Sequence, residues 1–209
     1  MRSKTAWMTA AVAAAALVAW EAPAQRAGLP DSSAEEAIEP LFSAADLTYM
    51  QHMIVHHEQA VVMSLLVPER SDRPEFHRFA DFVRRAQAAE IGMMRSLLDL
   101  AAERGLDLPE PHLHDDPPMA GMLSSAQMDA LAAASGDEFE RLWLEGMIFH
   151  HQGAIDMSHA QQRRQLTSGR RPYGLGVLVE EIVVEQRAEI TKMRDWLEVW
   201  GLANTRASE

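Results

Sequence analysis

Two pairs of adjacent histidines, each flanked by methionines, are the residues of this sequence best suited to chemistry. The pairs are His56 with His57 and His150 with His151. Imidazole nitrogen and thioether sulfur are ligands for soft and borderline metal ions. The chain contains no cysteine, which excludes zinc–thiolate sites, disulfides and thiol nucleophiles and leaves methionine as the soft sulfur ligand. The sequence therefore predicts a metal site built from histidine and methionine.

Both histidine pairs lie in a repeated segment. Residues 53–64, MIVHHEQAVVMS, and residues 147–158, MIFHHQGAIDMS, are identical at seven of twelve positions. A second pair of segments follows, QAAEIGMMRSLL at 87–98 and QRAEITKMRDWL at 186–197, again identical at seven of twelve. An internal repeat of this kind indicates that each half of the chain is one two-element unit.

The spacing of apolar residues in these segments predicts helices. Tyr49, Met53, His56, Ala60 and Met63 recur at steps of three or four, which places them on one helical face, and the second copy repeats this rhythm from Trp143 to Met157. Ser43 and Asp46 indicate a helix start, and Pro68 indicates its end. Later stripes, from Phe76 to Ala101 and from Ile182 to Trp200, predict the second helix of each half, ending near Gly105 and Gly201.

Short connections make the helices of each half antiparallel, and neither hairpin can bury its apolar face alone. We therefore expect an all-α protein, a ferritin-like four-helix bundle built from two duplicated helical hairpins. The expected organisation is a signal peptide (1–24), a flexible N-terminal segment (25–42), a first hairpin (43–106), a Pro-rich linker with a short helix from about Ser124 to Ala134 (107–135), a second hairpin (136–201) and a C-terminal tail (202–209).

The residues that we expect to bind metal lie on or beside the inward stripes. They are His52, Met53, His56, His57, Met63 and Glu90 in the first half, and Met147, His150, His151, Met157 and Glu189 in the second. A weaker set comprises His112, His114, Met119 and Met122 in the linker, with His159. The alternative for methionines on a helical stripe is ordinary core packing, and Glu90 and Glu189 could serve only to pair with His or Arg. Adjacent residues on a helix point about 100° apart, so His57 should diverge from the stripe of His56. Because imidazole binds metal when neutral, affinity should fall near pH 6.5.

Charge and the N-terminus restrict the partners and the location. The net charge of −12 and the lack of long Lys/Arg runs exclude a nucleic-acid partner. Residues 1–24 resemble an export signal, with Arg2 and Lys4 before an apolar stretch and Ala22-Pro23-Ala24 as the cleavage site. The stretch is shorter than the roughly 20 residues of a membrane-spanning helix, although an uncleaved anchor is the alternative. We expect a periplasmic or secreted protein with no stable membrane insertion after cleavage, and a homo-oligomer is possible.

At these motifs the chain resembles the domain of unknown function 305 family. The resemblance covers about residues 43–201 and rests on MIxHHxxAxxMS followed by QxxEIxxMR in both halves. The family's proline before the histidine pair is replaced by Val55 and Phe149, and Glu58-Gln59 stands where the second half has the commoner Gln152-Gly153. The resemblance implies a ferritin-like, often exported bundle, and it favours copper, with Cu(I) preferred, for tolerance, storage or delivery.

Two other functions remain open from the sequence. A ferritin-like di-metal oxidase needs bridging carboxylates and two Glu-x-x-His pairs, and no Glu-x-x-His occurs in this chain. We therefore expect that the protein is not an enzyme. A metal-free helical interaction module is the other alternative, and exposed histidine pairs would favour it.

Overall fold

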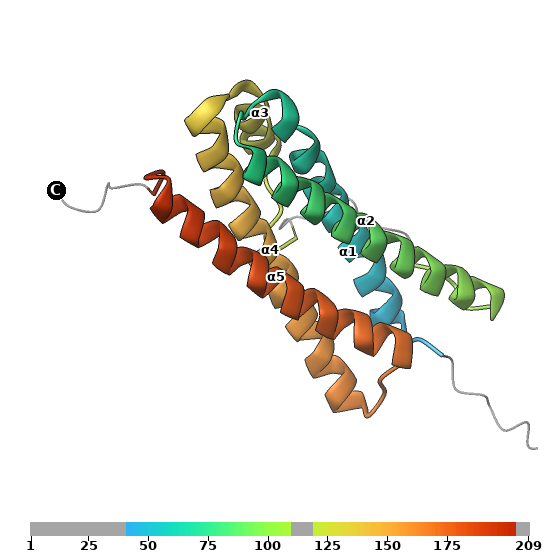
Figure 1. Cartoon of the computed structure of the whole chain (residues 1–209). Helices are drawn as coiled ribbons and strands as arrows, with labels where there is room; N and C mark the ends of the chain where they lie inside the picture. The colour runs from blue at the N-terminus through green and yellow to red at the C-terminus, as the bar shows by residue number, and fades with distance from the viewer. Residues whose placement is uncertain (1–40, 110–118, 204–209) are drawn as a thin grey trace, which may run out of the picture. The chain divides into compact units, whose positions relative to one another are not determined.

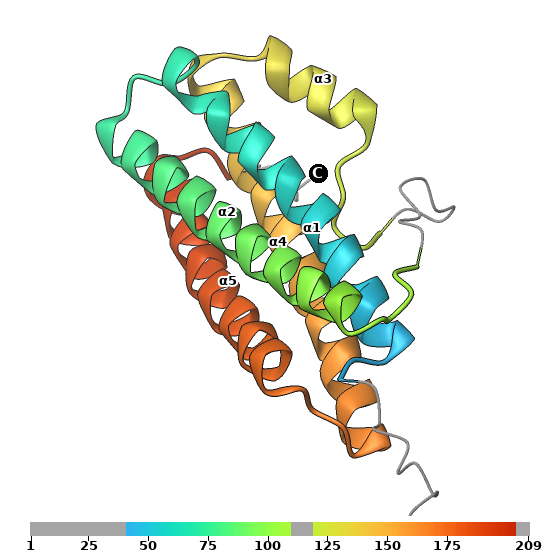
Figure 2. The ribbon, with the colours of Figure 1, turned by 90° about the vertical axis from the view of Figure 1, so that its right-hand side faces the viewer.

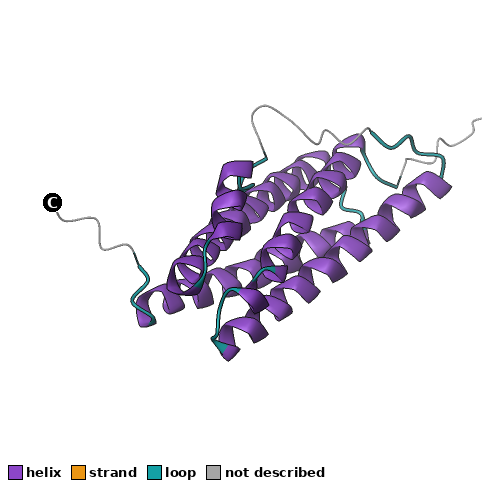
Figure 3. Ribbon diagram, turned by 90° about the horizontal axis from the view of Figure 1, so that it is seen from above, coloured by secondary structure: helices purple, strands orange, loops and turns teal. Residues whose placement is uncertain are grey.

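The computed structural model describes residues 41–109 and 119–203, and this part of the chain is all-α (Figure 3). Five α-helices follow one another, with a short 3₁₀ turn at Val67–Glu69 after the first. They are α1 (Ala44–Leu65), α2 (Pro74–Glu103), α3 (Ser125–Ala133), α4 (Gly136–Ser168) and α5 (Tyr173–Val199). The predicted signal peptide (1–24), nearly all of the predicted N-terminal segment (25–42), and residues 110–118 and 204–209 lie outside the described residues.

Serine caps begin two of these helices, and a glycine ends a third. Ser43 caps α1 in a capping box with Asp46, and Ser124 caps α3 in the same way with Gln127. These reciprocal bonds satisfy backbone N–H groups that the first turn of a helix leaves without partners. Gly169 ends α4 in the left-handed conformation, at φ 68°, which a glycine adopts without steric cost.

The helices pack as two pairs, α1 with α2 and α4 with α5 (Figure 1). Contacts between α1 and α4 and between α2 and α5 join the pairs, while α3 packs on α4 (Figure 2). The prediction of an all-α fold is confirmed in this form. None of the described helices combines the length and the apolar character needed to cross a bilayer.

Apolar side chains form two clusters, and the histidine pairs lie where one gives way to the other. On α1, Leu47 to Ile54 belong to one cluster and Ala60 and Met63 to the other, which also contains Phe76, Trp143 and Trp196. On α4, Met147 belongs to the second cluster and Ala154 to the first. On α1 the histidine pair thus lies between the two clusters, and on α4 it lies where residues of both clusters meet.

Candidate metal centre

All four histidines of the two pairs are buried, with no exposed surface. The sequence predicted one inward stripe on α1, through His56, with His57 pointing away. Both are buried because α1 packs on two helices at once: His57 faces α2, where it meets Glu90, and His56 faces α4, where its ring lies 3.8 Å from that of His150 between centroids. Two adjacent residues can therefore point in different directions and both lie inside.

Backbone carbonyls fix one ring nitrogen of His56 and His150. Nε2 of His56 donates to the carbonyl oxygen of Ala120 at 3.0 Å, and Nε2 of His150 donates to the carbonyl oxygen of His56 at 2.8 Å. A carbonyl can only accept, so the proton of each neutral ring is on Nε2. The lone pair of each ring is then on Nδ1.

Carboxylates hold the other two histidines in the same way in both hairpins. Nε2 of His57 lies 2.8 Å from Oε2 of Glu90, and Nε2 of His151 lies 2.6 Å from Oε2 of Glu189. Burial, and then the charge of Glu189, raise the pKa of Glu90 to about 8. Glu90 and Glu189 thus pair with histidine, which was the alternative to their acting as direct ligands.

The four Nδ1 atoms are buried and have no hydrogen-bond partner within the described residues. A buried polar atom without a partner costs about 1–3 kcal/mol, and four such atoms in neighbouring rings call for a common explanation. Histidines that bind metal through one nitrogen commonly donate the other N–H to a carboxylate or a backbone carbonyl, which is the arrangement of all four rings here. The donor set therefore fits a metal ion bound through Nδ1.

His56, His57 and His150 stay neutral far below the usual histidine range. Burial, and then the neighbouring His57, lower the pKa of His56 to about 3, and burial together with His151 lowers the pKa of His57 to about 3. Burial and His56 hold the pKa of His150 well below its usual value. The expectation that metal affinity falls near pH 6.5 used the pKa of solvated imidazole, and the lowered pKa of these three rings places the expected loss of affinity at lower pH.

Three of the predicted methionines, Met53, Met63 and Met147, are fully buried on the same helices as the histidines. The structure separates two other predicted residues from them: His52 and Met157 line a pocket on the surface beside Tyr49. Within residues 41–109 and 119–203 no group of three or more His, Asp or Glu side chains is placed to hold one ion. A site of three or more ligands thus requires thioether sulfur.

The weaker set of predicted ligands is divided. Met119 and Met122 are half-buried, while His112 and His114 lie outside the described residues. His159 is half-buried, and its Nε2 lies 3.2 Å from an Arg187 guanidinium nitrogen, which donates to it. Met119 and Met122 flank Ala120, whose carbonyl oxygen accepts from His56, so this part of the linker does lie beside the histidine helices.

A backbone segment, residues 119–123, crosses the two histidine helices and was missed by the sequence analysis. On α4 it lies so close that a Cβ on Gly153 would stand 2.1 Å from the carbonyl oxygen of Ala120. On α1 the amide of Gln59, at the position equivalent to Gly153, exchanges two hydrogen bonds with the backbone of Leu123, at 2.8 and 2.9 Å. The difference between Glu58-Gln59 and Gln152-Gly153 was the signal for this segment, which we call the crossing segment.

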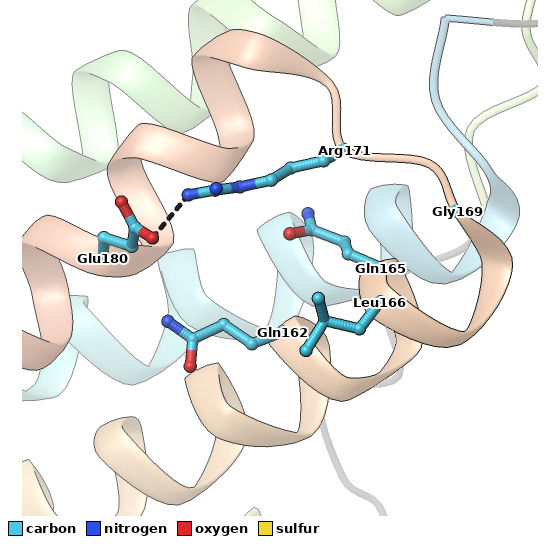
Figure 4. A pocket seen from close by; sticks show the side chains of 6 residues that line it. All are labelled: Gln162, Gln165, Leu166, Gly169, Arg171 and Glu180. Carbon is cyan, nitrogen blue, oxygen red and sulfur yellow. Dashed lines mark ion pairs between the residues drawn. The ribbon is translucent and has the colours of Figure 1, made fainter.

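Another cleft lies between the end of α4 and α5 and is lined by Gln162, Gln165, Leu166, Gly169, Arg171 and Glu180 (Figure 4). Arg171 and Glu180 form an ion pair across it, at 2.5 Å. Gln162 is eleven residues beyond His151 on α4, which is roughly 16 Å along the helix. The cleft contains no histidine or methionine and has no part in the metal centre.

Comparison with known proteins identifies the family of this chain. The profile of the domain of unknown function DUF305 matches residues 46–197. The chain belongs to the DUF305 family. A search of curated proteins finds no relative. Solved DUF305 structures include one from Streptomyces coelicolor, described as a "putative secreted protein", with 33% identity over 75% of this chain and 92% of that chain and a TM-score of 0.62.

Two further solved structures extend the comparison. A DUF305 fragment from Deinococcus radiodurans has 29% identity over 75% of this chain and 97% of its own, with a TM-score of 0.63. CopM in the Cu(I)-bound form has 26% identity over 74% of this chain and 96% of its own, with a TM-score of 0.56. CopM has also been solved with Cu(II) and with Ag.

Proposed function

We propose that this DUF305 protein is an exported copper-binding protein, with Cu(I) the preferred ion. The observation that carries the proposal is the set of four buried Nδ1 atoms without partners, each on a ring whose Nε2 is already held. Such rings are oriented before metal arrives, and an ion would satisfy atoms that the fold leaves unpaired.

The candidate ligands in this proposal are Nδ1 of His56, His57, His150 and His151 and the sulfur atoms of Met53, Met63 and Met147. Within the described residues no three of the imidazoles are placed to share one ion, so each ion would take at most two of them. Glu90 and Glu189 orient two of the rings. Thioether and imidazole favour Cu(I) over hard cations, and the need for sulfur to complete a site of three or more ligands strengthens that preference. When bound, copper would supply the electrophile that these lone pairs lack.

Relatives support the choice of metal and of compartment. CopM binds Cu(I), Cu(II) and Ag, and it is 25–26% identical to this chain. Export rests on residues 1–24 and on the description of the Streptomyces coelicolor relative. We assign the protein to copper tolerance, storage or delivery, on a ferritin-like bundle of two duplicated hairpins.

Burial of the histidine pairs disfavours the metal-free interaction module, because that function would expose them. An oxidase is disfavoured because Glu90 and Glu189, the carboxylates beside the histidine pairs, each pair with a histidine of their own hairpin. A di-metal centre instead needs carboxylates that bridge two ions.

The test is to titrate metal-free protein with Cu(I), buffered by a competing chelator without oxygen, and with Cu(II). Changing Met53, Met63 and Met147 to Leu conserves volume and keeps the fold. We expect this variant to lose tenfold or more in Cu(I) affinity and less in Cu(II) affinity. The matched control changes three other buried methionines, Met50, Met94 and Met193, to Leu and should bind as wild type does.

Changing all four histidines to Ala should abolish binding of both ions. A folded variant of this kind that binds as tightly as wild type would contradict the proposal. The linker residues His112, His114, Met119 and Met122 would then be the site to test.

A further inference from the structure

The buried histidines need a route from solvent, and a cleft on the surface is lined by Glu90, the hydrogen-bond partner of one of them. It lies between α2 and α5, has a volume of about 390 Å³, and is lined by Ala89, Glu90 and Met93 from α2 and by Glu181 and Glu185 from α5. Glu90 is also the hydrogen-bond partner of His57, at 2.8 Å. One side chain therefore touches both the cleft and the metal centre.

One carboxyl oxygen of Glu90, a lining residue of the cleft, is free to meet a cation. The residue is 8% exposed, and its Oε1 is buried with no hydrogen-bond partner in the described part of the chain, while Oε2 holds His57. A carboxyl oxygen that lacks both water and a donor is costly unless a cation or a proton meets it. This unpaired oxygen is a feature separate from the acidic side chains at the mouth of the cleft.

The mouth of the cleft is acidic. Glu181 and Glu185 are exposed. Partial burial, and then the charges of Glu90, Glu189 and Glu181, raise the pKa of Glu185, because these carboxylates lie near one another. Within residues 41–109 and 119–203, neither Glu181 nor Glu185 has an arginine or lysine partner.

Arg85 and Met93 modify the character of the lining. Arg85 also lines the cleft, but it is paired with Asp81 at 3.1 Å. Met93 leaves 46% of its surface exposed one turn beyond Glu90, where its sulfur adds a soft ligand to the carboxylates. The cleft thus combines negative charge with a thioether.

We propose that the cleft between α2 and α5 is the access route of the metal ion, in which Glu181 and Glu185 capture the cation and Met93 and Glu90 lie next on its path toward the buried histidines. This inference rests on the proposed function and adds the path to it. Negative charge in a cleft with low-dielectric walls concentrates cations and raises their association rate, most strongly at low ionic strength. The route predicts a kinetic effect without a change in the number of ions bound.

The experiment measures association of Ag⁺, added as the nitrate in chloride-free buffer, by stopped-flow tryptophan fluorescence of the full mature chain. Trp143 is fully buried and donates through Nε1 to the backbone of Met63 at 3.0 Å, so that it reports on the centre. We expect E181Q/E185Q to slow association on the order of threefold to tenfold at low ionic strength, with unchanged capacity at equilibrium. Added sodium nitrate should reduce the difference.

The matched control, D195N/E198Q, removes the same charge from exposed positions further along α5 and should associate as wild type does. A second variant, A89W, places a large side chain in the lining and should slow association at every ionic strength. Wild-type rates in both cleft variants would overturn the route while leaving the proposed function intact. Failure of the wild-type protein to bind Ag⁺ or Cu(I) at all would overturn the proposed function, and the route with it.

Discussion

Replacing Gly153 by alanine should destabilise this protein, although the same change in most helices stabilises them. Gly153 lies within α4, where glycine costs about 1 kcal/mol relative to alanine. Its Cβ would stand 2.1 Å from the oxygen of Ala120, 2.4 Å from the carbonyl carbon of Ala120 and 2.5 Å from Cα of Gly121. All three are backbone atoms, so no side-chain rotation relieves the contact.

The magnitude follows from what must move. Ordinary contact begins at 3.4 Å, so the crossing segment must shift by about 1.3 Å, the difference between 3.4 and 2.1 Å. Overpacking of this kind costs about 1–3 kcal/mol. The shift also weakens the bond from His56 to Ala120, and a buried donor left without its acceptor costs about 1–3 kcal/mol more. After the gain in helix propensity, the net loss in the free energy of unfolding is about 1–5 kcal/mol.

The assay is urea denaturation of metal-free protein, followed by far-UV circular dichroism. Gly92→Ala is the control, because Gly92 lies within α2 with nothing within 4 Å of its added Cβ, and that variant should gain about 0.5–1 kcal/mol. Equal gains in stability for the two variants would refute the placement of the crossing segment against α4.

Three further predictions concern the buried polar groups of the metal-free protein. The pKa of His56 and of His57 is about 3 when the chain is folded and near 6.5 when it is unfolded, so the unfolded chain binds more protons between these values. The free energy of unfolding should therefore fall as pH drops below 6.5, by up to about 1.4 kcal/mol per pH unit for each histidine. Denaturation at a series of pH values measures this. Glu90 has the opposite effect, because its pKa of about 8 in the folded chain lies above its value of 4.5 in the unfolded chain, and the free energy of unfolding falls as pH rises between them. Glu90→Gln should flatten this decline. An unchanged profile would show that Glu90 is ionised when folded. Gln59→Leu removes two hydrogen bonds to Leu123 and should cost about 1–3 kcal/mol in a urea titration, whereas a neutral result would mean that the crossing segment does not need this anchor.

Sequence patterns predicted the helices well because their signals are local. The Ser43–Asp46 capping box, Pro68 after α1 and the Ser124 cap each act within one turn of the chain, and each stands where the pattern placed it. Burial of His56 and His150 followed from the same three-and-four spacing of apolar neighbours.

The partners of the histidines could not be predicted, because they come from segments distant in sequence. His56 donates to Ala120 and His150 to the backbone of His56, and a backbone carbonyl leaves no mark in the choice of residue. Burial of His57 required knowledge that α1 contacts two helices, which one stripe of apolar residues does not convey. Gly121 and Gly153 look like ordinary glycines until their close approach is seen.

The crossing segment also makes the two halves of the centre inequivalent. In an arrangement with two-fold symmetry, His56 would donate to the carbonyl of His150 just as His150 donates to the carbonyl of His56. Gly121 instead lies against that carbonyl, 2.7 Å from the position of an added Cβ, and His56 donates to Ala120. The crossing segment therefore contacts α1 and α4 in different ways, which two-fold symmetry would not allow. The carbonyl partners of His56 and His150 therefore differ, and the two imidazoles lie in different environments although their helices carry the same motif.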